Sequence, residues 1–114
     1  MLGERHPDTL GSMNNLAGLL QAQGKLEEAE PLFRAVLEGC REVLGERHPN
    51  TLSSMNNLAS LLEAQGKLGE AEPLYRAALE GRREVLGERH PETLTSIYNL
   101  ASLLQAHGVM SGTG

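Results

Sequence analysis

The stretch LGERHPNTLSSMNNLASLLEAQGKLGEAEPLYRAALEGRRE, residues 44–84, decides the fold, because the chain holds a near copy before it and begins another after it. The hexapeptide Leu-Gly-Glu-Arg-His-Pro starts at residues 2, 44 and 86, which sets a period of 42 residues. Residues 2–42 and 44–84 differ at eight of 41 aligned positions. A fixed period of this size indicates a repeat array, in which each unit covers its apolar face by stacking on the next. We expect units at 2–43 and 44–85, a partial unit at 86–110 and a flexible tail at 111–114.

The residue pattern of each full unit predicts two helices. Pro7 suits the first position of a helix, and the apolar residues after it recur at spacings of three and four, as on one buried stripe. Gly24 is a natural left-handed cap, and a second apolar stripe begins directly after it. Because the loops are short, paired helices must run antiparallel. The sequence therefore predicts an all-α fold of five helices: Pro7–Gln23, Leu26–Leu44, Pro49–Gln65, Lys67–Leu86 and Pro91–His107.

Composition excludes several classes of function. The net charge of −5 argues against nucleic acid, whose phosphates attract a surplus of lysine and arginine. No apolar run approaches the roughly 18 residues that suggest a membrane span. Cys40 is the single cysteine, so an internal disulfide is excluded and a reducing, cytoplasmic location is expected.

A histidine precedes the proline at the start of each unit, and histidine is a common metal ligand. His6, His48 and His90 recur once per unit, so we expect them to be separated by about 10 Å, the distance between packed helices. A zinc ion needs nitrogens at about 2.0–2.1 Å, so the three cannot converge on one ion. We interpret them as residues at the starts of helices. No nucleophile, base and orienting group lie at related positions, and no phosphate-binding glycine loop occurs. We expect no catalysis, no metal and no cofactor.

The small and large residues of the unit resemble the tetratricopeptide signature. In the first unit these are Leu16, Ala17, Leu20, Gly24, Lys25, Leu26, Ala29, Phe33, Val36 and Leu37, and most recur in the second. The 42-residue length, with His-Pro-x-Thr, Asn-Asn-Leu-Ala and Gln-Gly-Lys, is similar to the kinesin light chain and its array relatives. The resemblance implies a right-handed superhelix (an α-solenoid) whose first helices line a concave groove that binds extended peptides.

The predicted groove is rich in asparagine. Amide side chains offer a donor and an acceptor, so they can pair with a peptide backbone whatever its sequence. The alternative is that Asn15, Asn57 and Asn99 hold neighbouring helices at the repeat angle. Tyr98 could either anchor an apolar side chain of a peptide or fold over the end of the stack. The candidate groove residues are Asn14, Asn15, Asn56, Asn57, Ser60, Glu63, Tyr98, Asn99 and Ser102.

Charge narrows the expected partner. None of the ten lysines and arginines lies on the three first helices, so the groove is expected to be neutral to weakly acidic. Tetratricopeptide domains that hold chaperone C-termini use a clamp of Lys, Arg and Asn there. Here only Asn57 matches that clamp, while Asn14, Gly18, Thr95 and Asn99 occupy its other positions. Kinesin light chains take acidic cargo peptides, which the missing cations disfavour. A protein or peptide partner that is neutral to basic fits better.

The last helix is expected to lack a partner helix. Ile97, Leu100, Leu103 and Leu104 would then be uncovered on one side, which predicts a homodimer formed by stacking or by an exchanged hairpin. The near identity of the two full units favours an alternative function as a structural or self-assembling fragment of a longer or engineered array, with no ligand of its own. The leading interpretation is a non-catalytic protein–protein interaction module.

Overall fold

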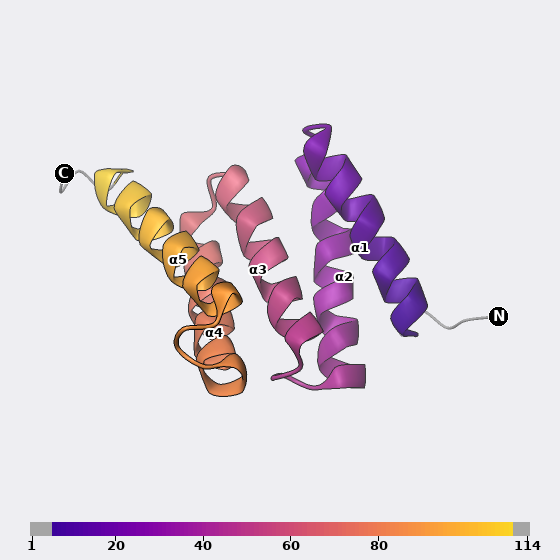
Figure 1. Ribbon diagram of the computed structural model, residues 1–114. Helices are drawn as coiled ribbons and strands as arrows, with labels where there is room; N and C mark the ends of the chain where they lie inside the picture. Colours follow the sequence, from indigo (N-terminus) through magenta and orange to yellow (C-terminus); the bar gives the residue numbers. More distant parts are fainter. Residues whose placement is uncertain (1–5, 111–114) are drawn as a thin grey trace.

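Five helices make up the part of the chain that the structure, a computed structural model, describes, residues 6–110 (Figure 1). They are α1 (Pro7–Ala22), α2 (Leu26–Leu44), α3 (Pro49–Ala64), α4 (Leu68–Leu86) and α5 (Pro91–Met110), and residues 6–110 contain no strand. The all-α prediction is therefore confirmed, with helix boundaries within one residue of those expected for α1 to α4. The start of the first unit and the predicted tail at 111–114 lie outside the described residues.

The helix starts explain the repeated His-Pro pair. The Nδ1 atoms of His6, His48 and His90 accept hydrogen bonds of 3.1, 3.0 and 3.1 Å from the backbone N–H two residues later. These are side-chain caps, which satisfy N–H groups that have no partner within the helix. The proline takes the first helical position, where its missing N–H costs nothing. The interpretation of the histidines as helix-start residues is confirmed.

In each of the first two units, a glycine lies just after the end of the first helix. Gly24 and Gly66 have φ angles of +81° and +82°, a conformation that residues with a Cβ rarely adopt. α5 differs, because it continues three residues past the expected end at His107. In the earlier units the chain turns at this point into a helix that packs back on the first one, and residues 6–110 contain no such helix after α5.

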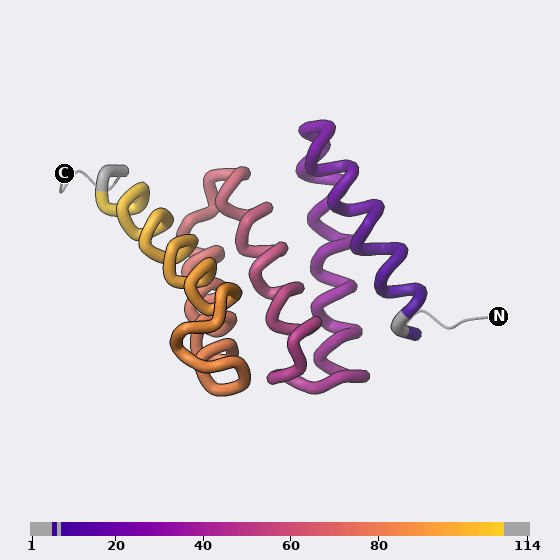
Figure 2. The backbone as a smooth tube through the Cα atoms, in the orientation of Figure 1, coloured from indigo at the N-terminus to yellow at the C-terminus, as the bar shows by residue number. Residues whose placement is uncertain are grey.

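Each helix packs on the next one along the chain, so that α1 and α5 lie at opposite ends of the array (Figures 1 and 2). Each first-type helix (α1, α3 or α5) can use two adjoining faces. One face packs on the second helix of its own unit, as Leu52 of α3 does against Gly81 of α4. The other packs on the preceding unit, as Ser54 of α3 does against Cys40 of α2. Because α3 has both neighbours, both of its faces are buried.

The outer helices each bury only one face, and this corrects the prediction for the C-terminal end. Leu100 and Leu103, expected to be uncovered, are only 8% and 0% exposed, because they lie on the face that packs on the preceding unit. The uncovered face instead carries Leu94, which is 52% exposed, with the exposed Leu104 and the half-buried Ile97. At the other end, Leu16 and Leu19 of α1 are exposed for the mirror-image reason: residues 6–110 contain no unit before α1.

Candidate functional site

The asparagines of neighbouring units pair with one another across the first-type helices. Asn57 Nδ2 donates to Asn14 Oδ1 at 3.4 Å, and Asn99 Nδ2 donates to Asn56 Oδ1 at 3.3 Å. These bonds join α1 to α3 and α3 to α5, and all four side chains are partly buried. We call this surface the asparagine face: Asn14, Asn15, Asn56, Asn57, Tyr98 and Asn99. The paired amides keep donor and acceptor capacity that the pair does not use.

The two unpaired members of this face lie at its ends. Asn15 has no preceding unit to donate to among the described residues, and it is exposed. Tyr98 is 72% exposed, so its ring does not fold over the end of the stack. Ser102 is also exposed, on the same helix. The residues that the structure leaves accessible are therefore the two ends of the asparagine face and the free edges of its amide pairs.

Ser60 and Glu63 of the predicted groove contact a second-type helix (α2 or α4). The hydroxyl of the buried Tyr75 donates to Glu63 Oε1 at 2.9 Å, and Ser60 also interacts with that hydroxyl. Burial first, and then the carboxylate, raise the pKa of Tyr75 well above its ordinary value. Glu63 is therefore held within the unit by a hydrogen bond.

This contact accounts for three of the eight differences between the two full units. Where the second unit has Ser60, Glu63 and Tyr75, the first has Gly18, Gln21 and Phe33. A phenylalanine has no hydroxyl to donate, so the acidic acceptor and the serine are dispensable in the first unit. The three differing positions are in contact with one another in the second unit.

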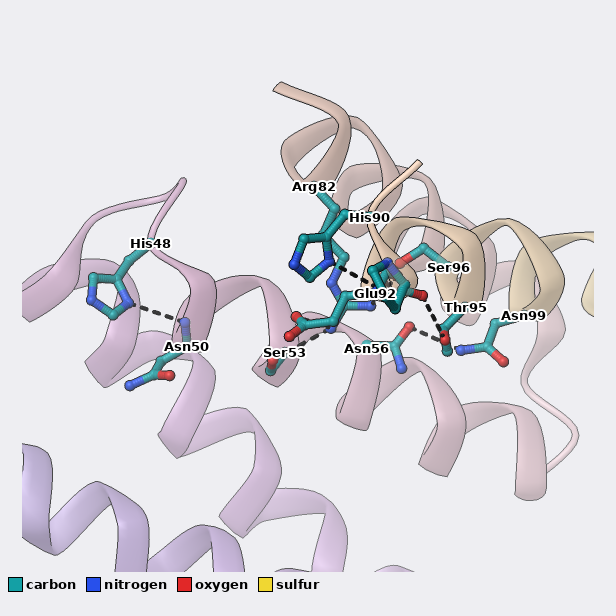
Figure 3. Close-up of polar contacts among 11 residues, drawn as sticks. His48, Asn50, Ser53, Asn56, Arg82, His90, Glu92, Thr95, Ser96 and Asn99 are labelled. Carbon is teal, nitrogen blue, oxygen red and sulfur yellow. Dashed lines mark hydrogen bonds and ion pairs between the residues drawn. The ribbon is translucent and has the colours of Figure 1, made fainter. Parts of the chain in front are cut away.

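A second contact accounts for further differences, and sequence reasoning missed it. Arg82 of α4 is only 6% exposed, and its guanidinium lies between α3 and α5 (Figure 3). Nη1 donates to Ser96 Oγ at 2.7 Å and to the carbonyl oxygen of Glu92 at 3.2 Å, while Nη2 donates to Ser53 Oγ at 3.4 Å. The Glu92 carboxylate lies 3.7 Å from Nη2. Burial lowers the pKa of Arg82, and Glu92 opposes that shift.

The corresponding place in the first unit holds Cys40 and a cavity. The cavity has a volume of about 210 Å³ between α1, α2 and α3. Its polar lining comes from Asn14, Asn50, Ser53, Ser54 and Asn57. Gly11, Leu10, Val36, Cys40 and Leu44 complete it. The Cys40 thiol is buried and lies 3.6 Å from Ser54 Oγ. Two differences between the units could have indicated this contact: Gly11 in place of Ser53, and Cys40 in place of Arg82. Only the fold shows that these two positions lie next to each other.

A larger hollow, about 850 Å³, lies at the turns between the helices of the first two units. Three of its charged side chains pair with one another: Glu30 accepts from Arg34 at 2.8 Å and from Lys67 of the next unit at 3.2 Å. The hydrogen bond from Arg34 is the main cause that lowers the pKa of Glu30 to about 2, and Gln65 and Lys67 add to it. Arg34 also pairs with Glu70 at 3.2 Å. These contacts hold adjacent units together, and we interpret this hollow as an inter-unit junction.

Two features bear on the classes excluded earlier. Among residues 6–110, no group of three or more His, Cys, Asp or Glu side chains is placed to hold a metal ion. Over the same range, each helix is either too short or too polar to cross a membrane.

The repeat geometry agrees with the comparisons. The sequence profile described as "Tetratricopeptide repeat" matches residues 8–84 and, in a second match, residues 55–108. The chain belongs to the tetratricopeptide repeat family. Proteins of this family are generally non-catalytic, and the fold implies a role in protein–protein interaction or as a scaffold. No curated protein sequence matches this chain closely enough to count as a relative.

Solved structures place this tetratricopeptide chain near the kinesin light chain type. A Podosopora anserina protein, described as a kinesin light chain with nearly identical TPR-like repeats, has a TM-score of 0.89 at 33% identity over 95% of this chain. A variant of the same protein has a TM-score of 0.82, at 33% identity over 94% of this chain. BtubC (BKLC) from P. vanneervenii has a TM-score of 0.82, at 27% identity over 90%. The chain spans 51%, 50% and 41% of these three structures, respectively, which is about half their length.

Proposed function

We propose that this chain is a non-catalytic interaction module that binds an extended, neutral-to-basic peptide along the asparagine face. The observation that supports it most directly is the chemistry of that face. α1, α3 and α5 carry no lysine or arginine, and free amide groups of the paired asparagines repeat from unit to unit. Such groups can hydrogen-bond a peptide backbone without reading its sequence.

Electrostatics decides the class of peptide. The chain carries a net charge of −5, so its field attracts basic segments and repels acidic ones. Arg82 is only 6% exposed, and both of its terminal nitrogens donate hydrogen bonds to groups of α3 and α5. An acidic peptide would therefore find no free cation on α1, α3 or α5.

A charge-placement experiment tests this proposal. Fluorescence polarisation with neutral, basic and acidic peptides of equal length should rank the basic ones first, with the preference weakening as salt rises. Asn56→Lys places one positive charge on the asparagine face and should weaken basic peptides severalfold. Gly69→Lys adds the same charge at an exposed site on α4, where a side chain would meet no neighbour, and should leave affinity nearly unchanged. Preference for acidic peptides, or equal effects of the two changes, would refute the proposal.

We also propose self-association of this chain through the uncovered face of α5. Leu94 and Leu104 of α5 correspond to Leu52 and Leu62 of α3. Those two leucines are fully buried because the following helix, α4, covers them. Covering a leucine completely is worth about 1.5–3 kcal/mol, so two copies gain by burying these faces together. This is the structural alternative to peptide binding.

Light scattering at high micromolar concentration tests the self-association. Leu94→Glu should give a monomer, because it places a charge in the proposed contact. Leu19→Glu puts the same charge on an exposed leucine at the opposite end and should leave a symmetric dimer intact. If both changes abolish association, the copies stack end to end. A wild-type chain that is monomeric at that concentration contradicts the proposal.

A further inference from the structure

The cavity beside Cys40 has an internal counterpart that shows what fits it. The helices pack in the same way at this place in both full units, although Val36 of the first stands where the second has Ala78. In the second unit the side chain of Arg82 occupies this place (Figure 3). In the first unit the aligned residue is Cys40, too short to reach across, and about 210 Å³ remains open. The cavity therefore corresponds to the site of a guanidinium group in its duplicate.

Two of the four groups that contact the guanidinium are retained, among them the acceptor of its shortest hydrogen bond. Ser96 accepts the shortest hydrogen bond of Arg82, at 2.7 Å, and its counterpart Ser54 lines the cavity. The carbonyl oxygen of Glu92 accepts the second, and its counterpart residue, Asn50, also lines the cavity. Leu44 and Val36 form an apolar wall suited to the methylene stem of a long side chain.

Two partners are lost, and neither is decisive. Gly11 stands where Ser53 accepts from Arg82, but that hydrogen bond is long, at 3.4 Å. Asn50 stands where the Glu92 carboxylate lies, but that carboxylate is 3.7 Å from the guanidinium and 52% exposed. Ion pairs with such exposure contribute little. No lysine or arginine lines the cavity, so nothing there repels a cation.

The cavity is within reach of the proposed peptide site. Gly11 at its rim is exposed, and Asn14 and Asn57, which belong to the asparagine face, form part of its lining. We propose that this cavity binds the arginine side chain of a peptide lying on the asparagine face. The inference rests on the proposed function and adds to it a specificity pocket for one residue type.

The test uses two small probes of equal length, N-acetyl-arginine amide and N-acetyl-citrulline amide, on the full chain. Nuclear magnetic resonance of the backbone amides of Gly11 and Ser54 should show saturable shifts with the arginine probe and at least fivefold weaker binding of the uncharged citrulline probe. Cys40→Arg should fold, because it restores the residue of the second unit, and should abolish the shifts. Cys40→Ser keeps a small side chain there and should retain them.

Two further variants test the chemistry of the pocket. Asn50→Glu supplies the exposed carboxylate that the duplicate has, and should tighten the arginine probe only modestly, by about threefold at most. Arg82→Cys should open a second pocket and add saturable shifts at Ser53 and Ser96. Wild-type chain without saturable shifts at Gly11 and Ser54, or shifts that persist unchanged in Cys40→Arg, would overturn the inference.

The result also separates the pocket from the peptide site as a whole. Suppose that peptides bind the asparagine face, but that an arginine-containing peptide binds no tighter than its citrulline version and Cys40→Arg does not change either affinity. The pocket inference is then wrong and the proposed function stands. If the arginine probe saturates the pocket while no longer peptide binds, the pocket is correct and the proposed function fails.

Discussion

Two equivalent glycines should respond differently to the same substitution, because one of them has room beside it. A Cβ added at Gly39 of α2 would lie 2.6 Å from Cδ2 of Leu10, and one added at Gly81 of α4 would clash with Cδ2 of Leu52. Leu52 is fully buried in α3, which packs against both α2 and α4. Leu10 also lines the cavity of about 210 Å³, so it can rotate toward open space.

The magnitudes follow from two opposing effects. Replacing glycine by alanine inside a helix gains about 0.8–1 kcal/mol through helix propensity. Overpacking a core costs typically about 1–3 kcal/mol. We expect Gly81→Ala to lower the free energy of unfolding by about 1–2 kcal/mol and Gly39→Ala by under about 1 kcal/mol. Gly18→Ala, whose Cβ would meet nothing within 4 Å, should raise it by about 0.5–1 kcal/mol.

Thermal and urea unfolding followed by circular dichroism measure all three variants against wild type. A change of 1 kcal/mol shifts Tm by about 4–8 °C in a domain of 60–100 residues, so the expected order is well resolved. The order should be Gly18→Ala, wild type, Gly39→Ala and Gly81→Ala from most to least stable. If Gly81→Ala is as stable as Gly39→Ala, the cavity beside Leu10 does not relieve the clash and the reasoning is wrong.

Three other predictions test local contacts. His48→Ala should cost about 1 kcal/mol of stability, whereas His48→Asn should keep most of it because an amide oxygen can cap the same N–H; equal melting temperatures would show that the cap contributes nothing. The pKa of Glu30 is lowered from 4.5 to about 2, so its stabilisation is complete above pH 4.5 and is lost between about pH 4.5 and 2. Since its partner Arg34 is nearly half exposed, Glu30 contributes under about 1 kcal/mol to the free energy of unfolding. In urea unfolding at several pH values, Glu30→Gln should lack this part of the decrease in stability at acid pH. Tyr75→Phe should destabilise by about 1 kcal/mol because the buried hydroxyl is lost, and adding Glu63→Gln, which reproduces the pair of the first unit, should restore part of it; additive effects in a double-mutant cycle would contradict the coupling.

The helices and their limits could be predicted from the sequence because they depend on neighbours along the chain. Apolar spacing, the His-Pro starts and the glycine at Gly24 each act within one or two turns, and the structure reproduces them. The same local rules failed where tertiary surroundings mattered. Leu16 carries the same pattern as Leu58, yet it is exposed because residues 6–110 contain no unit before α1.

The candidate site shows the same division. The repeated asparagines could be read from the sequence, but whether they point at a peptide or at each other depends on how far apart α1, α3 and α5 lie, and the structure pairs them. The prediction that Leu100 and Leu103 are uncovered was wrong because one helix has two packing faces, which a single apolar stripe does not distinguish.

The sequence by itself determined the repeat, the helices and the lack of cations on the first-type helices, since period, caps and charge are properties of the order of residues. Only the tertiary structure decided that Gly11 and Cys40 share a cavity that Ser53 and Arg82 close in the next unit. Residues that are 29 positions apart come into contact only when helices stack, and whether the space between them is filled depends on both side chains together.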